Sequence, residues 1–174
     1  MIDSNDQAPI GYNPVPEMTF SLAAGLNWKG IDFSILLQGA ARSSIYLQQD
    51  IAWDNFWGNY YEEHIGRWTP ETAATATYPR FTKAATPAHP NYYKSDYWLK
   101  DSKYLRLKNI QLGYTIPRKL LKKFGVRSLR VYANAYNLFT WDNVKKVDPE
   151  SSNNSNGQFY PQQKVINFGI NLNF

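Results

Sequence analysis

Side chains able to act as acids, bases or metal ligands seldom cluster in this sequence. The densest group is Glu62, Glu63 and His64, which could form an acid/base pair or part of a metal site. Adjacent carboxylates on a strand point to opposite faces, so Glu62 and Glu63 form a poor glycosidase couple. His89 has no partner at ligand spacing, and a lone histidine is more often a surface or packing residue. An enzyme is therefore the weaker hypothesis.

Oxygen ligands for a metal ion are present but do not follow the spacing of a dedicated site, and cysteine ligands are absent. Asp148, Glu150, Asn153 and Asn154 could hold calcium, but they lack the spacing of a dedicated calcium loop. The absence of Cys excludes disulfides, thiolate metal sites and cysteine nucleophiles. We expect no catalytic residue, no metal site and no cofactor.

Aromatic side chains are the most prominent candidates for binding. Flat aromatic faces stack on sugars and anchor protein interfaces, so those in the middle of the chain could contact a substrate or a partner protein. The alternative is that they pack this segment against itself, because a long segment must bury side chains to be ordered. The candidates are Trp53, Trp57, Tyr60, Tyr61, Trp68, Tyr92, Tyr93 and Trp98.

Composition narrows the class of protein. Hydrophobic residues make up 43% of the chain and aromatic residues 16%, which is too aromatic for a disordered chain. No stretch approaches the roughly 18 consecutive apolar residues of a transmembrane helix. The formal net charge is +5, but the basic residues fall in separate clusters, so we expect no nucleic-acid partner. A membrane role would have to use strands.

Two adjacent segments alternate between apolar and other residues. The first runs from Met18 to Trp28 and the second from Ile31 to Ala41. Lys29 and Gly30 separate them and have the length of a tight hairpin turn. A period of two over eleven residues predicts a β-hairpin with even positions of the first strand and odd positions of the second on one face.

Three further segments alternate in the same way. They run from Ile110 to Ile116, from Leu129 to Ala135 and from Val165 to Phe174. Pro117 ends the first of them, because proline has no N–H to continue a ladder. The intervening sequence RKLLKKFG predicts a helical turn that ends at Gly125. The sequence thus predicts five strands.

The two sides of these strands differ in a way that suits a membrane barrel. One side carries almost no charge, while the other carries Asn, Gln, Ser, Gly, Tyr and isolated charges, as a wet lumen requires. Outer-membrane strands need about nine to eleven residues. The fold class that we expect is all-β, with five antiparallel strands of a transmembrane β-barrel. The side chains expected to face the lumen are Asp32, Ser34, Gln38, Arg130, Tyr132, Asn134 and Tyr136.

The connections alternate between short and long. Residues 29–30 and 117–127 are short, whereas residues 43–103 and the segment from Trp141 to Lys164 are long. Outer-membrane barrels have short periplasmic turns and long extracellular loops. We therefore expect residues 43–103 to form one long extracellular loop.

Several segments resemble a known family, and the resemblance covers nearly the whole chain. Those that carry it are RWTPETAATATYPRF from Arg67, SDYWLKDSKYLRLKNIQLGYTIP from Ser95, and SLRVYANAYNLFTW from Ser128. They resemble the C-terminal signatures of SusC/RagA-type TonB-linked outer-membrane proteins of Bacteroidetes. The opening from Asp3 to Ala40 is similar to the family's stretch before the long loop.

The resemblance implies a fold, a function and a set of partners. Family members are 22-stranded barrels with an N-terminal plug that import glycans, peptides or other large nutrients, with a SusD-like surface lipoprotein as a lid. We expect this chain to be the C-terminal part of such a barrel in the cell outer membrane, with plug and signal peptide absent. The expected substrate is a glycan or oligosaccharide, with a peptide as the alternative, and the TonB complex would act through the missing N-terminal part.

The last eight residues resemble the terminal signal by which outer-membrane barrels are recognised for assembly. Its residues are Asn167, Gly169, Leu172 and Phe174, and its partner would be the barrel assembly machinery. The alternative is an ordinary last strand whose Phe174 anchors in the aromatic girdle beside outer-membrane lipid. Both can hold together.

One soluble class competes with the barrel. In a β-sandwich carbohydrate-binding module the same aromatic side chains would form an open sugar platform. The two hypotheses differ in solubility, because a module folds in water and a barrel with a charge-free outer face needs detergent.

Overall fold

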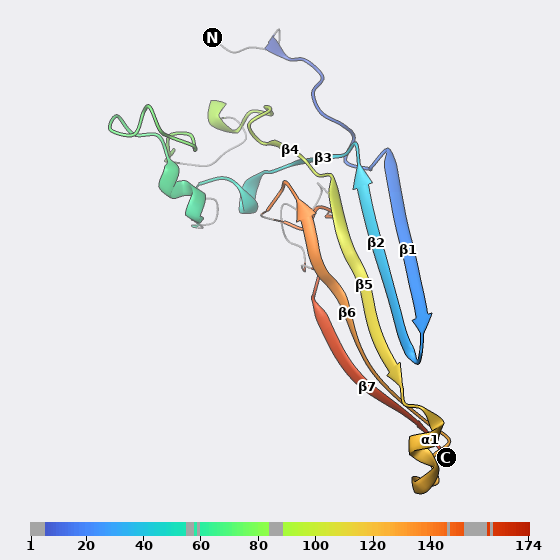
Figure 1. Cartoon of the computed structure of the whole chain (residues 1–174). Helices are drawn as coiled ribbons and strands as arrows, with labels where there is room; N and C mark the ends of the chain where they lie inside the picture. Colours follow the sequence, from blue (N-terminus) through green and yellow to red (C-terminus); the bar gives the residue numbers. More distant parts are fainter. Residues whose placement is uncertain are drawn as a thin grey trace. The chain divides into compact units, whose positions relative to one another are not determined.

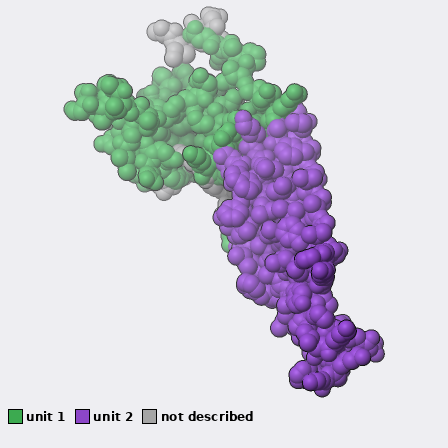
Figure 2. Space-filling model, viewed as in Figure 1, with its two compact units in different colours: residues 1–16, 42–102, 143–160 green, residues 17–41, 103–142, 161–174 purple. Residues whose placement is uncertain are grey.

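The structure is a computed structural model that describes residues 6–54, 58, 60–83, 89–145, 147–151, 160 and 162–174. The chain divides into two compact units built from interleaved segments, coloured separately in Figure 2. We call residues 17–41, 103–142 and 161–174 the sheet unit, and residues 1–16, 42–102 and 143–160 the loop unit.

The sheet unit is one five-stranded antiparallel sheet in the order β1-β2-β5-β6-β7 (Figure 1). Each of the five strands pairs with the next of the five along the chain, as the alternation predicted. Strands β3 and β4 belong to a separate sheet. The bounds are β1 Met18–Trp28, β2 Ile31–Ala41, β5 Tyr104–Thr115, β6 Ser128–Asp142 and β7 Val165–Asn173.

The first hairpin follows from its two turn residues. Lys29 and Gly30 have φ values of 48° and 90°, as the twist-compatible type of two-residue hairpin turn requires. The carbonyl of Gly30 accepts a 2.7 Å hydrogen bond from the backbone N–H of Thr115, which ties the turn to β5. The turn sets the register in which Trp28 lies opposite Ile31.

Strands β5 and β6 are longer than the alternation predicted. β5 begins at Tyr104 rather than Ile110, and β6 continues to Asp142 rather than ending at Ala135. The register of β5 against β2 skips Lys108, and the register of β6 against β5 shifts at the same level. A bulge adds one residue and reverses the alternation. The period of two is therefore reversed inside β5, whereas β6 skips both Asn137 and Leu138 and keeps its parity. In β6 the polar Asn137 interrupts the apolar side, which hid the full length of that strand.

The short connection between β5 and β6 is helical, as predicted. Pro117 precedes the single helical turn α1, Arg118–Leu121, and the 3-10 turn η5, Lys122–Phe124. Gly125 ends it with a φ of 69°, in the left-handed conformation that glycine adopts without steric cost. None of the helices described in the structure has the length and hydrophobicity that crossing a membrane requires.

The loop unit contains secondary structure that the sequence did not reveal. Strands β3, Ser44–Tyr46, and β4, Leu99–Asp101, pair antiparallel. The described residues between these strands include three 3-10 turns: η2 Gln49–Ile51, η3 Glu62–Gly66 and η4 Pro90–Tyr92. The buried side chains form one apolar cluster of Ile45, Leu47, Ala52, Trp53, Tyr78, Tyr92, Trp98 and Val144. The unit therefore has a core of its own.

Candidate functional site

The strand register places the polar side chains of the sheet unit on one face. Asp32 lies opposite Gly113, which lies opposite Tyr132, and Ser34 lies opposite Gln111, which lies opposite Asn134. All seven residues expected to face a lumen lie on this face, which we call the polar face. They are Asp32, Ser34, Gln38, Arg130, Tyr132, Asn134 and Tyr136. That the polar face lines a lumen stays a prediction.

An ion pair crosses the middle strand of the polar face. Arg130 of β6 donates from Nε and Nη2 to the two carboxylate oxygens of Asp32 on β2, at 2.9 and 2.5 Å. A Cβ on Gly113 of β5 would lie 2.5 Å from both Asp32 Oδ1 and Arg130 Nη2. The missing side chain of Gly113 is thus what lets the pair form over β5. A glycine inside a strand, such as Gly113, is the sequence signal for such a close approach of side chains from neighbouring strands.

Aromatic and amide side chains complete the polar face. Tyr132 covers Gly169 of β7, where a Cβ would lie 2.4 Å from the tyrosine ring, and the Arg130 guanidinium carbon is 4.8 Å from the same ring's centroid. Asn167 donates to Asn134 at 3.0 Å. Two of the expected assembly-signal residues therefore hold β7 against β6.

The other two assembly-signal residues lie elsewhere. Leu172 pairs with Leu129 on the opposite, apolar face of the sheet. Phe174 follows the end of β7 and has an exposed side chain. A role for these four residues in assembly stays a prediction.

The opposite side of the sheet is apolar and exposed. Leu22, Phe168 and Ile170 are 62%, 82% and 69% exposed. Aromatic side chains lie near both ends of this apolar face, with Trp28 and Tyr114 at the end of the hairpin turn. Those near the other end are Phe139 and Trp141, whose rings stack with centroids 6.2 Å apart. An apolar band between two aromatic girdles is the pattern of an outer-membrane strand surface.

Three aromatic candidates of the loop unit belong to its core. Trp53, Tyr92 and Trp98 are each 3% exposed, and the rings of Trp53 and Tyr92 lie 4.7 Å apart. For these three side chains the packing alternative describes the structure, and they are not available to a ligand here. The sequence could not predict that these three side chains are buried, because tryptophan and tyrosine occur both in protein cores and at binding surfaces.

A buried carboxylate organises this core. Asp54 is 1% exposed and accepts hydrogen bonds from the Tyr78 hydroxyl at 3.3 Å, the backbone N–H of Thr82 at 2.9 Å, and the Tyr92 hydroxyl. Burial, followed by the nearby Asp54 charge, raises the pKa of Tyr78. Burial and then the hydrogen bond to Asp54 raise the pKa of Tyr92. Both hydroxyls stay protonated and act as donors, so the group is structural.

His64 has a structural role in the same unit. Its Nδ1 accepts the backbone N–H of Tyr61 at 3.0 Å, which leaves Nε2 to donate to the carbonyl of Ala52 at 3.2 Å. Glu62 and Glu63 are exposed on η3 rather than on a strand. Both ring nitrogens of His64 are therefore engaged by backbone groups, and the acid/base hypothesis for this triplet has no geometric support.

The oxygen-rich segment near residue 150 forms a turn. Asp148 Oδ1 accepts the backbone N–H of Glu150 at 2.9 Å, while Asn153 and Asn154 lie outside the described residues. Across the described ranges, no three His, Cys, Asp or Glu side chains lie close enough to hold a metal ion.

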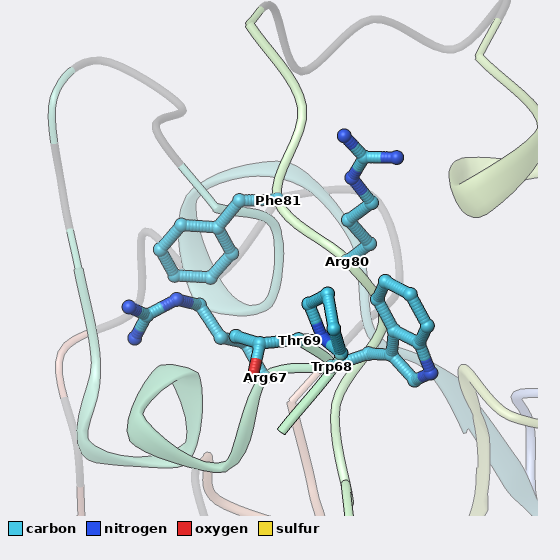
Figure 3. Close-up of a pocket in the computed structure, with 6 residues that line it drawn as sticks. Arg67, Trp68, Thr69, Arg80 and Phe81 are labelled. Atoms are coloured by element: carbon cyan, nitrogen blue, oxygen red, sulfur yellow. The ribbon is translucent and has the colours of Figure 1, made fainter. Parts of the chain in front are cut away.

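Four of the remaining aromatic candidates have exposed or partly exposed side chains. Tyr60, Trp68 and Tyr93 are exposed, Tyr61 is half-buried and donates to the carbonyl of Asp50, and Trp57 lies outside the described residues. Trp68 lines a pocket of about 340 Å³ together with Arg67, Thr69, Pro70, Arg80 and Phe81 (Figure 3). The Arg67 guanidinium carbon lies 5.0 Å from the centroid of the Phe81 ring.

The pocket does not form an anion clamp. Figure 3 shows the guanidinium groups of Arg67 and Arg80 pointing in different directions. Two cations grip one anion only when their donors converge on it. The candidate contact role of Trp68 stays a prediction.

Comparison with known proteins agrees with this geometry. TonB-dependent receptor P26 of Formosa agariphila is 30% identical over 192 residues, covering 99% of this chain. TonB-dependent receptor SusC of Bacteroides thetaiotaomicron is 26% identical over 99% of the chain. The chain is a homologue of part of the TonB-dependent receptors. No protein-family model matches it.

Solved structures of the RagAB peptide transporter share the fold. The RagAB peptide transporter superposes with a TM-score of 0.75 at 23% identity over 99% of the chain, and the RagAB peptide importer in its open-open state with 0.74 at 22% over 100%. These matches show that the fold is shared and agree with the family resemblance. The chain spans about a fifth of the length of these receptors and structures.

Proposed function

We propose that the chain forms part of the barrel wall of a TonB-dependent nutrient transporter in the outer membrane. The observation that carries the proposal is the division of one long-stranded sheet into a charge-free face between aromatic girdles and a polar face with an ion pair. Hydrocarbon tolerates only the first face and an aqueous lumen favours the second.

The same proposal assigns a direction to the connections. The two-residue hairpin turn and the α1 connection lie at the periplasmic end, and the loop unit, with residues 43–103, is extracellular. The edges of β1 and β7 must be paired, because an open sheet edge leaves backbone groups unsatisfied in hydrocarbon. Further strands of the barrel, 22 in all by the family resemblance, meet this need.

Import by such a barrel requires partners. We propose a SusD-like surface lipoprotein at the extracellular mouth, the TonB complex as the energy source, and the barrel assembly machinery during insertion. The exposed aromatic side chains Tyr60, Trp68 and Tyr93 are suited to contact the lipoprotein or a substrate, because exposed rings anchor interfaces.

The substrate has two candidate classes. A glycan or oligosaccharide fits exposed aromatic side chains, which stack on sugars. A peptide is the alternative, supported by the RagAB proteins, which are described as a peptide importer and a peptide transporter.

A growth experiment tests the function and separates the substrates. The gene that encodes this chain is deleted, and growth is measured on oligosaccharides or on peptides as the sole nutrient, beside a strain lacking TonB. We expect both strains to lose growth on one nutrient class and to keep growth on monomers. Unchanged growth of the deletion strain on every polymer would overturn the proposed import.

A further inference from the structure

The connection between β5 and β6 combines positive charge with exposed apolar side chains. We call residues 117–127 the basic turn. It contains no acidic residue, and in the described part of the chain none of its basic side chains forms an ion pair or hydrogen bond. These side chains, all exposed, are Arg118, Lys119, Lys122, Lys123 and Arg127.

Two large apolar side chains project from the same turn. Leu120 and Phe124 are 65% and 76% exposed, whereas Leu121 is 6% exposed. Leu121 is therefore the buried apolar side chain of this turn, whereas most of the surface of Leu120 and Phe124 is exposed. Exposed apolar side chains rimmed by cations need a partner that is apolar and anionic.

The basic turn lies at one end of the sheet unit. It connects the end of β5 to the start of β6, where Tyr114 pairs with Val131. Figure 1 shows α1 at the end of the sheet where the β1–β2 hairpin turns. Trp28 and Lys29 lie at that hairpin, with the lysine Nζ 4.8 Å from the tryptophan ring. This end of the apolar face carries the girdle that marks a membrane–water boundary.

We propose that the basic turn is a lipid-binding element, with its lysines and arginines on anionic phospholipid headgroups and Leu120 and Phe124 inserted among the upper acyl chains. Charge complementarity favours this occupant, since clustered basic residues beside a membrane bind anionic lipid. The inserted pair adds apolar burial, as in interfacial amphipathic segments. The girdle of Trp28 and Tyr114 is continuous with this contact.

The proposal rests on the proposed membrane insertion, and the test separates the two. The transporter carrying this chain is placed in nanodiscs of phosphatidylcholine, with or without phosphatidylglycerol. The chain has no cysteine, so Phe124→Cys gives it one site for a fluorophore, and any cysteine elsewhere in the transporter is first replaced. Quenching by bromine-labelled lipid tails reports contact with acyl chains. Heat-modifiable mobility of the same sample reports the inserted barrel.

We expect strong quenching with phosphatidylglycerol and weak quenching without it. Replacing Lys119, Lys122 and Lys123 by Gln should weaken lipid contact roughly a hundredfold, because each basic residue strengthens attraction to an anionic surface about fivefold. The matched control replaces Lys83 and Lys94 of the loop unit by Gln and should change nothing.

Three results would overturn the proposal in a sample whose barrel is inserted. They are equal quenching in both lipids, no quenching in either, and quenching unaffected by the three Gln substitutions. Protection of the probe from aqueous quenchers without any lipid quenching would point to a protein partner instead. A sample without heat-modifiable mobility would contradict membrane insertion itself.

Discussion

Asp54 shows how a single buried side chain orders a long connection. Three donors from separate parts of the loop unit converge on its carboxylate: Tyr78, Thr82 and Tyr92. A buried carboxylate without such donors would be strongly destabilising, so the donors and the acceptor depend on one another. The aromatic core therefore tolerates this charge only in its hydrogen-bonded arrangement.

The tyrosines of this group predict a loss of loop stability at alkaline pH. Burial raises the pKa of Tyr78 and of Tyr92 above the ordinary value of about 10. The folded loop thus holds these protons more tightly than the unfolded loop. Their contribution is complete below about pH 10 and is lost as the pH rises through the folded pKa values. Protease cleavage within residues 43–103, measured against pH, checks this.

A hydroxyl deletion provides the control. Tyr92→Phe keeps the ring but removes one titrating group and one donor to Asp54. We expect faster cleavage at neutral pH, from about 1 to 3 kcal/mol of lost loop stability, and a shallower alkaline increase. An identical pH profile in the variant would show that Tyr92 does not contribute.

Gly113 is a second position where one residue decides a local arrangement. Gly113→Ala would place a Cβ 2.5 Å from atoms of both Asp32 and Arg130. We expect about 1 to 3 kcal/mol of destabilisation from the displaced ion pair. The measurement is the temperature at which the inserted barrel loses its heat-modifiable mobility.

Gly25 offers a matched glycine for that experiment. A Cβ at Gly25 would meet its nearest atom, the carbonyl oxygen of Phe33, at 3.5 Å, an ordinary contact. Gly25→Ala should therefore leave the transition temperature unchanged. Equal effects of the two alanines would mean that loss of backbone freedom, rather than the ion pair, explains the result.

At the scale of a strand, the two faces predict opposite tolerance to charge. Leu22→Arg places a cation on the apolar face, and near the membrane midplane we expect a cost of about 2 to 4 kcal/mol. Ser34→Arg places it on the polar face, between Gly25 and Gln111, where the cost should be small. Folding into lipid vesicles under urea titration measures both. Similar destabilisation by the two arginines would contradict the assignment of faces.

The bulge at Lys108 keeps the apolar side chains of β5 on one face of the sheet. Leu107 and Ile110 lie on the apolar face although they are three residues apart. Without the extra residue, one half of β5 would turn its leucines towards the polar side. The bulge therefore preserves the separation of faces along the full length of β5.

At the scale of the molecule, the last strand predicts an assembly defect. Phe174→Ala removes an exposed terminal aromatic that contributes nothing to a core. We expect less barrel in the outer membrane, because recognition of the final strand precedes closure, and normal transport by each barrel that inserts. Heat-modifiable mobility and uptake per inserted barrel measure the two quantities separately.

The opposite result would reassign Phe174. Normal insertion with impaired uptake would make it a transport residue. Tyr160→Ala, at another exposed aromatic side chain, is the matched control and should leave insertion unchanged.

Five strands, their order and their two faces could be read from the sequence. Alternation is a local property, and a side chain's parity within a continuous strand decides its face. The hairpin at Lys29 and Gly30 and the helical turn ending at Gly125 were equally local, since both depend on backbone conformations that few residues adopt.

Only the tertiary structure decided the rest. Parity fails beyond Lys108, because a bulge depends on what the neighbouring strands require. Trp53, Tyr92 and Trp98 proved to be core residues of the loop unit. The structure brings Tyr78 and Thr82 to Asp54 in this core, although 24 and 28 residues separate them from it along the chain. The missing side chain of Gly113 matters only because Asp32 and Arg130, 98 residues apart, form their ion pair over it. These are contacts between distant residues, which the order of residues along the chain does not record.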